Sequence, residues 1–559
     1  MAWDHEVDWL VVGSGAAGMS AALRGHDLGM SVLVVEASDQ YGGSTAISGG
    51  VVWVPNNDQI AGRGIPDSPA DALTYLKEVT RGEVSEERLQ AYVDHAPRMQ
   101  SWMHEHTWLK LDSLEKYTDY YPEAPGGRPG GRSMEPEIFD ATVLGPEFAR
   151  LRRPHPQSQV MGKFGISARQ AHGFLAPTPR DTLMLVWLFV LWFLRGIKRR
   201  GQPRDTRLHA GNALIGRLRR SMMDRDLPLW LDTPCTDLVI EDGRVVGAVL
   251  EREGEPFRVA ARKGVLLGAG GFEQNQEWRD EHHTLGLSKV EWNTGNPRNQ
   301  GDGIRMGRDA GGALANMHEA WWTPVTRVPR SDPAWVLVVE KSLPGSLFVN
   351  GAGQRFTNEA APYEDVVRGM YRGDAVPTCW MIFDAECRRL YPVGPTAPGY
   401  AQPDKRLSRR LREGFFTRGA TLEELAGKLE LDSSALATTV ARYNEFCRAG
   451  IDEDFGRGSS ASDRYYGDRR VQPNPCLRPL THAPYYAIPI FPGELGTKGG
   501  LVTDPWARVL REDGTVVPGL FAAGNTSAAV MGPSYPGAGG TIGPALTFGM
   551  LAAEAAAEG

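Results

Sequence analysis

The first 36 residues contain a βαβ dinucleotide-binding pattern, which constrains the fold more than any other part of the chain. Asp8 to Val12 (DWLVV) predicts a short buried strand, and a glycine turn, a helix and a second strand ending before Glu36 follow. The turn contains Gly13, Ser14, Gly15, Ala17 and Gly18. The first glycine makes the turn, the second admits a pyrophosphate, and the third lets helix and strand pack. Because Glu36 stands where an acid accepts from ribose hydroxyls, we predict an α/β fold that binds a dinucleotide.

A second cluster of glycines and hydroxyls indicates which dinucleotide is bound. The candidate cofactor ligands of YGGSTAISGG (Tyr41 to Gly50) are Gly42, Gly43, Ser44, Thr45, Ser48, Gly49 and Gly50. A nicotinamide site does not usually need such a cluster, whereas a flavin is held along its whole length by amides and hydroxyls. No second GxGxxG follows a strand elsewhere in the sequence. We therefore predict FAD, without a metal, and expect electrons to pass from the substrate to an external acceptor.

Two later segments have the pattern of strands that return to the cofactor. VLLGAGGFEQN (Val265 to Asn275) contains Gly270, and GLFAAGNTSAAV (Gly519 to Val530) contains Gly524 and Asn525. Directly afterwards, MGPSYPGAGGTIGPALTFG places Tyr535 in a glycine-rich turn that leads into an apolar helix. Such a turn can bind an anionic ring or an oxyanion at the helix N-terminus. Gly540 and Ile542, at this helix start, are predicted to contact the flavin.

The length of 559 residues exceeds what one core supports, so at least two domains are expected. We predict a Rossmann-like (glutathione-reductase-type) discontinuous FAD-binding domain, formed by residues 1–322 and 494–559, with an insertion at about 145–206. An α+β catalytic domain is predicted over 323–493, from the strand signals SLFVN and WMIFD and the helical residues 421–447. Thr, Asp and Ser caps bound these helices. Ligand sites favour the interface between such domains.

Composition narrows the possible partners and the compartment. The net charge of −7 and the absence of a basic stripe argue against nucleic-acid binding. The five cysteines show neither CxxC pairing nor zinc spacing, which predicts free thiols in a reducing cytoplasm. Small molecules are therefore the expected partners, and the sequence does not determine the oligomeric state.

One apolar run, Leu183 to Leu194, leaves two interpretations open. It is followed by Arg195, Lys198, Arg199 and Arg200. Twelve apolar residues are too few for a spanning helix, which needs about 20. The run is consistent with an interfacial anchor, with tryptophans at headgroup depth and basic residues against anionic lipid, which would give peripheral membrane contact through 183–200. A buried or subunit-facing helix is equally consistent, because the run is apolar on all sides.

With these motifs in view, the chain resembles the 3-ketosteroid Δ1-dehydrogenases, FAD enzymes of the fumarate reductase-like superfamily, over nearly its whole length. GSGAAG with Glu36 and GGSTAISGG are typical of the superfamily. The resemblance also rests on PGELGTKGGLVTD (Pro492 to Asp504). More specific are KYTDYYPEAPGGRPGGRS (Lys116 to Ser133), QRFTNEAAPY (Gln354 to Tyr363) and SYPGAGGTIGPALTFG.

The resemblance implies the 1,2-desaturation of steroid ring A and four site residues. Tyr535 and the Gly539 amide would hold the C3 carbonyl and stabilise the enolate. Tyr363 would take the proton from C2, and hydride would pass from C1 to flavin N5. Tyr120 would lower the pKa of Tyr363 or relay its proton, with Tyr121 as the alternative. The chemistry needs such groups, because one preorganised oxyanion donor contributes about 3 kcal/mol and a phenol with a pKa near 10 needs help to act as a base.

Three other functions compete with this interpretation. A fumarate or succinate oxidoreductase would share the flavin fold, but it would need arginine and histidine side chains where the substrate motifs here contain tyrosine, proline and glycine. A 3-ketosteroid Δ4-(5α)-dehydrogenase would use the same flavin and a similar carbonyl clamp, and the DYYPE loop favours Δ1 over it. A catalytically silent flavin-binding or membrane-scaffold protein would not require the three tyrosine loops.

Overall fold

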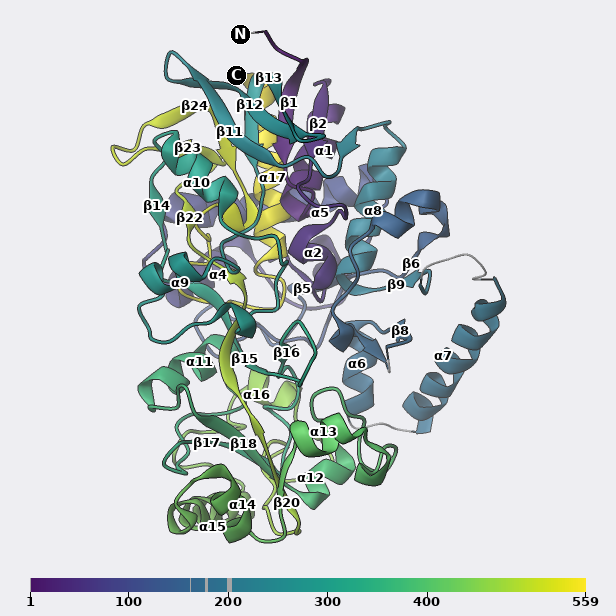
Figure 1. Ribbon diagram of the computed structural model, residues 1–559, viewed down its shortest axis with the longest axis vertical. Coiled ribbons are helices and arrows are strands. Elements are labelled where there is room, and N and C mark those ends of the chain that lie inside the picture. Colours follow the sequence, from purple (N-terminus) through teal and green to yellow (C-terminus); the bar gives the residue numbers. More distant parts are fainter. Residues whose placement is uncertain (1, 161, 176–178, 199–203) are drawn as a thin grey trace.

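A sheet assembled from both ends of the chain forms the part of the molecule that contains the two termini (Figure 1). The computed structural model describes residues 2–160, 162–175, 179–198 and 204–559. In it, β1 (His5–Val12) pairs in parallel with β2 (Val32–Val35) and with β13 (Glu255–Leu267). On its other side β13 pairs in parallel with β24 (Val516–Ala522). The four strands predicted around the cofactor are therefore confirmed, in one mixed α/β fold.

Two helices from opposite ends of the sequence cover this sheet together. α1 (Ala16–Asp27) packs along α17 (Ile542–Glu558), and Figure 1 shows them side by side in purple and yellow. Ser20 Oγ donates to the Leu546 carbonyl at 2.6 Å, and a Cβ on Gly549 would lie only 2.4 Å from the Ala17 carbonyl oxygen. The close approach requires glycine at 549, and it brings the N-termini of α1 and α17 to one place.

A second sheet lies at the opposite end of the molecule (Figure 1). Its strands run in the order β17 (Ser346–Asn350), β18 (Cys379–Asp384), β20 (Tyr485–Pro489) and β19 (Thr417–Gly419), all antiparallel. The predicted helical residues form α14 (Leu422–Leu429) and α15 (Ser433–Ala449), and the side chains of Thr421 and Asp432 cap them. β15 (Ala320–Thr326) and β21 (Phe491–Thr497) pair between the two ends, and α11 (Tyr363–Arg372) packs on β15.

The described residues of the predicted insertion form two α-helices, and the outer one exposes an apolar face. α6 (Ala168–Leu175) is followed by α7 (Pro179–Lys198), which Figure 1 shows at the edge of the molecule. Leu188 is buried on the inner face, and the ring of Phe189 lies 5.0 Å from that of Phe164. The outer face consists of Leu183, Val186, Trp187, Val190, Phe193 and Leu194, which are 41–70% exposed. The interpretation of this run as a helix buried within the chain is therefore wrong for the outer face.

The spacing of these side chains explains why the sequence did not show whether the run at 183–194 is buried or exposed. Successive members of the outer face lie three residues apart or next to one another, which is the repeat of one face of an α-helix. The inner face is also apolar, so composition alone did not separate the two. Within the described ranges, no helix has the combined length and hydropathy to cross a membrane. Of the four basic residues predicted to meet lipid, Arg199 and Arg200 lie outside those ranges.

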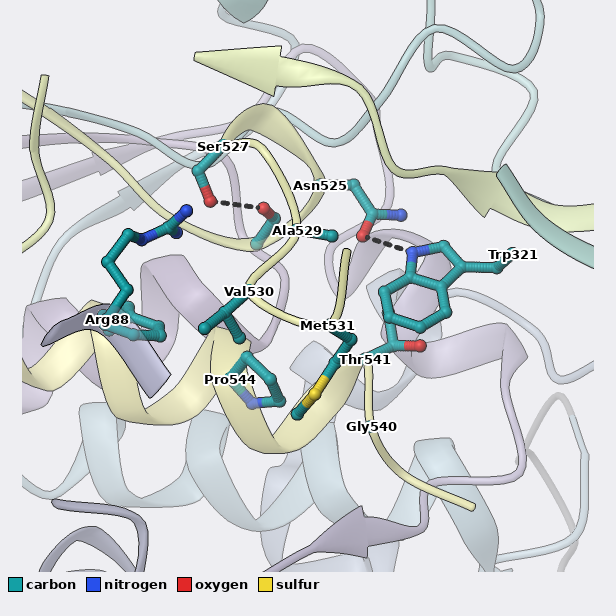
Figure 2. Close-up of a pocket in the computed structure, with 12 residues that line it drawn as sticks. Arg88, Trp321, Asn525, Ser527, Ala529, Val530, Met531, Gly540, Thr541 and Pro544 are labelled. Atoms are coloured by element: carbon teal, nitrogen blue, oxygen red, sulfur yellow. Dashed lines mark hydrogen bonds between the residues drawn. The ribbon is translucent and has the colours of Figure 1, made fainter. Parts of the chain in front are cut away.

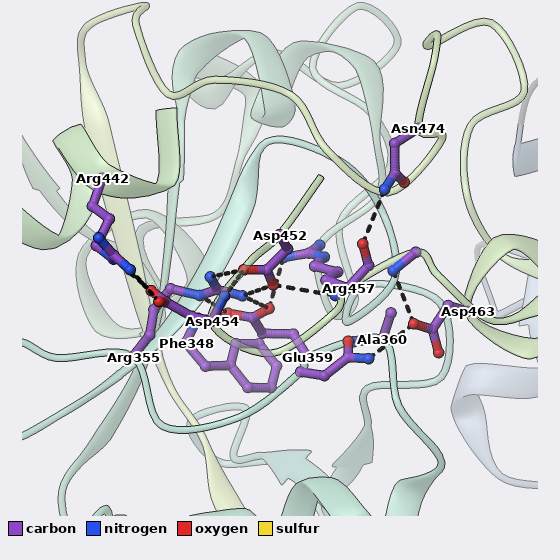
Figure 3. Close-up of polar contacts among 12 residues, drawn as sticks. Phe348, Arg355, Glu359, Ala360, Arg442, Asp452, Asp454, Arg457, Asp463 and Asn474 are labelled. Carbon is purple, nitrogen blue, oxygen red and sulfur yellow. Dashed lines mark hydrogen bonds and ion pairs between the residues drawn. The ribbon is translucent and has the colours of Figure 1, made fainter. Parts of the chain in front are cut away.

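A buried network of arginines and carboxylates joins two loops beside the second sheet (Figure 3). Arg355 forms ion pairs with Glu359 and Asp452, both at 2.9 Å, and Arg457 pairs with Glu359 at 3.1 Å. Each of the four side chains is at most 4% exposed. Arg457 also donates to the Ser346 carbonyl at the start of β17. Desolvated charges are tolerated only when they are paired and hydrogen-bonded, so the loop that precedes Tyr363 has little freedom to move.

We expect Arg457→Met to lower the free energy of unfolding by about 3–5 kcal/mol, because it leaves the Glu359 carboxylate buried with one partner fewer. Arg442→Met is the matched control. Arg442 pairs with Asp454 in the same region (Figure 3), but its side chain is 56% exposed, and exposed pairs contribute about 0–1 kcal/mol. Urea unfolding followed by circular dichroism compares the two variants. Equal losses of stability would contradict a structural role for the buried network.

Candidate active site

The glycine turn between β1 and α1 has the shape that a pyrophosphate requires. Gly13 has φ +104°, and a Cβ there would lie 2.3 Å from the Gly268 carbonyl oxygen. A Cβ on Gly18 would lie 1.9 Å from the Gly13 oxygen. By contrast, a Cβ on Gly15, at the N-terminus of α1, would have only Thr45 Oγ1 within 4 Å, at 3.7 Å. The first and third glycines are thus needed for the fold, and the second leaves space where a helix N-terminus favours an anion.

The acid at the end of β2 lies beside this turn. Glu36 is 7% exposed, and its carboxylate accepts from the Ser14 amide at 3.1 Å and the Ser14 hydroxyl at 2.6 Å. The Ser14 hydroxyl in turn accepts from the Gly42 amide at 3.0 Å, and Ser38 N–H donates to Glu36 at 3.1 Å. The turn, the acid and the second glycine cluster are therefore brought together. Ala17 lies in the first turn of α1, next to this group.

The second cluster forms a short helix, α2 (Gly43–Ile47), whose hydroxyls face other parts of the candidate cofactor site. Thr45 Oγ1 accepts from the Ala16 amide at 3.2 Å. Ser44 Oγ accepts from Asn296 N at 3.1 Å and from Asn299 Nδ2 at 3.2 Å. These two asparagines had no recognisable sequence motif and were not predicted.

The backbone at the end of the second glycine cluster, residues 48–50, is constrained as well. Ser48 Oγ accepts from the Gly50 amide at 3.0 Å. A Cβ on Gly50 would lie 2.2 Å from Ala210 C, whereas one on Gly49 would meet no atom within 4 Å. Gly49 therefore leaves open space, and Gly50 permits a close contact between two backbones.

The later segments complete the candidate cofactor site (Figure 2). Gly270 has φ +85°, and a Cβ there would lie 2.5 Å from Asn299 Nδ2. Asn525 Oδ1 accepts from Trp321 Nε1 at 3.2 Å. A cavity of about 20 Å³ is lined by residues that include Gly524, Asn525, Gly540, Thr541, Trp321 and Arg88. Ile542 is the first residue of α17.

These residues fit FAD. Gly15 and Gly49 leave open space that a side chain would fill, the N-termini of α1 and α17 can face anionic groups, and Glu36 stands at the end of the second strand. The predicted cofactor residues come from four separate parts of the sequence. Glu36 and the turns with Gly13, Gly270 and Gly524 follow parallel strands, so they lie at one edge of the sheet.

Three tyrosines predicted to do the chemistry meet in one buried cluster. Tyr120, Tyr363 and Tyr535 are 8%, 7% and 6% exposed. The ring centroid of Tyr120 lies 5.6 Å from that of Tyr363 and 5.1 Å from that of Tyr535. Burial raises the pKa of Tyr535 to about 12 and that of Tyr363 well above 10, while a hydrogen bond with Tyr120 acts in the opposite direction on Tyr363. Tyr120 therefore lies between the other two.

Neighbouring tyrosines distinguish Tyr120 from its alternatives. Burial raises the pKa of the Tyr121 phenol, as does the neighbouring Asp365, whereas Ser534 lowers it. Burial likewise raises the pKa of Tyr117, although the neighbouring Tyr120 acts to lower it. The Tyr117 hydroxyl lies 2.7 Å from that of Tyr466. Phenol groups thus form a row from Tyr363 through Tyr120 and Tyr117 to Tyr466.

Backbone contacts hold the Tyr120 loop against the Tyr535 loop. The Tyr120 amide donates to the Pro536 carbonyl at 2.9 Å, and the Tyr75 hydroxyl donates to the same oxygen at 2.5 Å. Asp119 accepts from Trp53 Nε1 at 2.8 Å and pairs with Arg132 at 2.9 Å. The spacing of the two phenols is therefore set by rigid backbone rather than by free loops.

Gly539 presents an amide at the same place. Its φ is +95°, and a Cβ would lie 2.4 Å from Trp53 N, so other residues do not fit. The Gly539 carbonyl accepts from the Trp53 amide at 3.1 Å. The Gly539 N–H has no acceptor among the residues that the structure describes. It is available to an anionic oxygen near Tyr535.

A buried ion pair behind Tyr535 was not predicted. Lys498 pairs with Glu364 and donates to the Ser534 carbonyl at 2.8 Å. Its ammonium lies 4.6 Å from the centroid of Trp321, whose ring lies 4.9 Å from that of Tyr535. Burial is the main cause that raises the pKa of Glu364, to about 7, and lowers that of Lys498. Lys498 is the lysine of the PGELGTKGG motif, and no role was predicted for it.

Comparison with known proteins identifies the family. Residues 8–542 match the model of the FAD binding domain family. A 3-oxosteroid 1-dehydrogenase of Mycobacterium tuberculosis is 44% identical, over 98% of both chains.

Solved structures agree with these matches. The 3-ketosteroid Δ1-dehydrogenase of Sterolibacterium denitrificans, solved with 1,4-androstadiene-3,17-dione, is 44% identical with a TM-score of 0.96, over 99% of this chain and all of the other. The 3-ketosteroid Δ4-(5α)-dehydrogenase of Rhodococcus jostii is 22% identical with a TM-score of 0.69, over all of this chain and 98% of the other, and it shows likeness of fold alone. The chain therefore belongs to the FAD-dependent 3-oxosteroid 1-dehydrogenase family.

Proposed function

We propose that this enzyme introduces the C1–C2 double bond into ring A of 3-ketosteroids. The observation that carries the proposal is the cluster of Tyr120, Tyr363 and Tyr535 beside the predicted FAD site, in a chain 44% identical over its length to a 3-oxosteroid 1-dehydrogenase. The related structure that was solved with 1,4-androstadiene-3,17-dione supports the same substrate class. Such a desaturation removes a proton and a hydride from neighbouring carbons.

Tyr535 and the Gly539 amide bind the C3 carbonyl oxygen of the steroid. A proton beside a ketone becomes removable near neutral pH when fixed donors stabilise the negative charge that develops on this oxygen. The phenol hydroxyl and the N–H come from one rigid glycine turn, so little reorganisation accompanies the reaction. Because burial holds the pKa of Tyr535 at about 12, it stays protonated and can donate.

Tyr363 takes the proton from C2, and Tyr120 passes it on. The edge-to-face contact of the two rings, with centroids 5.6 Å apart, supports this relay, and the row of phenols continues to Tyr117 and Tyr466. FAD, when bound, would supply the acceptor for the hydride that leaves C1. The residues that would hold it are the predicted glycines of the turn at 13–18 and the cluster at 42–50, with Glu36, Gly270, Gly524, Asn525, Gly540 and Ile542.

Two wider features belong to the same proposal. The discontinuous Rossmann-like FAD-binding domain is formed by residues 1–322 and 494–559, and the catalytic domain by 323–493, so the tyrosine cluster draws on both. Electrons leave the reduced flavin for an external acceptor.

Anaerobic addition of androst-4-ene-3,17-dione is expected to bleach the flavin absorbance and to yield the 1,4-diene. Absorbance spectra and chromatography of the extracted steroid measure the two outcomes together. Bleaching by a 5α-reduced 3-ketosteroid with formation of the 4-ene instead would identify a Δ4-(5α)-dehydrogenase. No bleaching with any 3-ketosteroid, together with reoxidation of the reduced enzyme by fumarate, would overturn the proposal.

Tyr363→Phe is expected to lower the rate of flavin reduction by about 10²–10⁴, because it removes the base while keeping the ring. The flavin spectrum should stay unchanged. Tyr443→Phe is the matched control, since Tyr443 is fully buried in another cluster and its hydroxyl has no partner among the described residues. Rapid-mixing absorbance measures both variants. A near-normal rate in Tyr363→Phe would mean that another group is the base.

We also propose that the outer face of α7 lies on the surface of an anionic membrane. Six large apolar side chains on one face of a 20-residue helix are more than a water-facing surface usually carries. Trp187 lies within this face, and Arg180 and Arg195 stand near the helix ends, as in helices that bind the interface of a bilayer. The opposite face contributes Trp192 to a cleft of about 1000 Å³, which Ile47 of the second glycine cluster also lines. A membrane on the outer face would place a hydrophobic substrate near this cleft.

Replacing Leu183, Trp187 and Phe193 by serine is expected to weaken binding to vesicles that contain phosphatidylserine by at least about tenfold, since each loses apolar burial worth about 1.5–3 kcal/mol. Ile451→Ser is the control, because Ile451 is 65% exposed elsewhere on the molecule. Vesicle flotation at low and high salt measures binding. If the unchanged protein does not float and the triple variant turns a dimer into a monomer, α7 is a subunit interface instead.

A further inference from the structure

We propose that Lys341 is a positioning residue for the base: its buried ammonium fixes the loop before Tyr363 and places a positive charge over the phenol ring, where it stabilises the deprotonated form. The proposal rests on the proposed function, because it concerns Tyr363 as the base.

The geometry places Lys341 directly against the base. Lys341 is 4% exposed, in the segment between β16 (Trp335–Val336) and β17. Its Nζ donates to the Ala360 carbonyl at 2.8 Å and to the Ala361 carbonyl at 2.6 Å. These two residues immediately precede Pro362, which is followed by Tyr363. The same Nζ lies 5.1 Å from the centroid of the Tyr363 ring, within the range of a cation–π contact.

The arginine network of Figure 3 fixes both sides of this contact. Arg457 Nη2 donates to the Lys341 carbonyl at 3.3 Å and to the Leu343 carbonyl at 2.8 Å. Through Glu359, the same guanidinium holds the loop that ends at Tyr363. The lysine and the loop are thus attached to one buried anchor, so the ammonium and the ring keep their relative position.

Among the residues that the structure describes, no carboxylate lies within ion-pair distance of Lys341. Lys498, the other buried lysine near the tyrosines, forms an ion pair with Glu364. Among the described residues Lys341 forms no ion pair, and two of its three N–H donors go to neutral carbonyls. An unneutralised charge in a buried site acts strongly on a neighbouring group, because little water screens it.

A base such as Tyr363 needs this charge. Burial raises the pKa of its phenol well above 10, and Tyr117, Tyr535 and Glu340 raise it further, against the single hydrogen bond from Tyr120. A cation near the ring favours the phenolate over the phenol, which opposes these effects.

Lys341 itself is charged at neutral pH. Burial lowers the pKa of Lys341 to about 8, and Arg457 lowers it too, whereas Asp463, Cys476 and Asp365 raise it. A group with a pKa of about 8 is protonated near pH 7. The contact therefore has a cation in it under the conditions in which the enzyme works.

The test compares Lys341→Met, which removes the charge, with Lys341→Arg, which keeps it. The readout is the rate of flavin reduction by androst-4-ene-3,17-dione as a function of pH. This rate rises as the base deprotonates. Below about pH 8, where Lys341 is charged, loss of the cation should therefore displace the rising limb to higher pH by about one unit or more, with an approximately tenfold lower rate near pH 7 per unit. The rate of Lys341→Met should approach that of the unchanged enzyme at high pH. Lys341→Arg should keep the original limb.

Controls separate this effect from a loss of folding or of activity as such. Lys428→Met removes an exposed lysine, paired with Glu424 on α14, and should leave the profile unchanged. Flavin absorbance and the midpoint of thermal unfolding check each variant, and Lys341→Gln replaces Lys341→Met if the latter does not fold. A rate that falls equally at every pH, or a limb that moves as far in Lys341→Arg as in Lys341→Met, would overturn the proposal. If no 3-ketosteroid reduces the flavin of the unchanged enzyme, the proposed function fails instead.

Discussion

The position of β13 between β1 and β24 is the constraint on which the rest of the site depends. Hydrogen bonds at Val265–Leu267 join a strand from the start of the chain to one from its end. Since the carboxyl ends of parallel strands meet at one edge of a sheet, the turns that follow these strands lie side by side. Tyr535 follows the end of β24 by only 13 residues. This pairing therefore sets the location of the proposed oxyanion donors relative to the proposed cofactor site.

Buried charge fixes the other half of the site. The loop before Tyr363 is held by Glu359, Arg457 and Lys341, and the loop before Tyr535 by Lys498. Desolvating such groups is costly, and replacing a buried ion pair by apolar residues is often neutral for stability. A network of this kind is therefore poorly explained by stability alone. Here it holds two phenols from distant segments in fixed positions, which apolar contacts specify less sharply.

Much of this arrangement was predictable from local sequence pattern. The strands at Asp8–Val12 and Gly519–Ala522, the glycine turns and the capped helices of residues 421–447 each have a short-range signal, and the structure confirms them. The five cysteines are free and buried. The resemblance implied that Tyr120, Tyr363 and Tyr535 act in one site. In the structure, the ring centroids of Tyr363 and Tyr535 lie within 6 Å of that of Tyr120.

The parts of the site that were not predicted depend on contacts between residues far apart in the chain. Lys341, Lys498, Asn296 and Asn299 stand in no motif whose spacing reveals a partner, so only the folded chain shows what they touch. The packed face of the apolar run at Leu183–Leu194 could not be predicted for a different reason. Both of its faces are apolar, so periodicity did not tell the packed face from the exposed one.

The sharing of one sheet between the two ends of the chain has a consequence for biosynthesis. While the ribosome is still translating, β13 can pair with β1, but β24 and α17 do not yet exist outside the exit tunnel. The second sheet, formed entirely by residues 346–489, can fold earlier. The proposed cofactor site needs β24 and the start of α17 as well as β1. We therefore expect a chain cut short before these elements not to load the flavin, although it keeps most of its sequence.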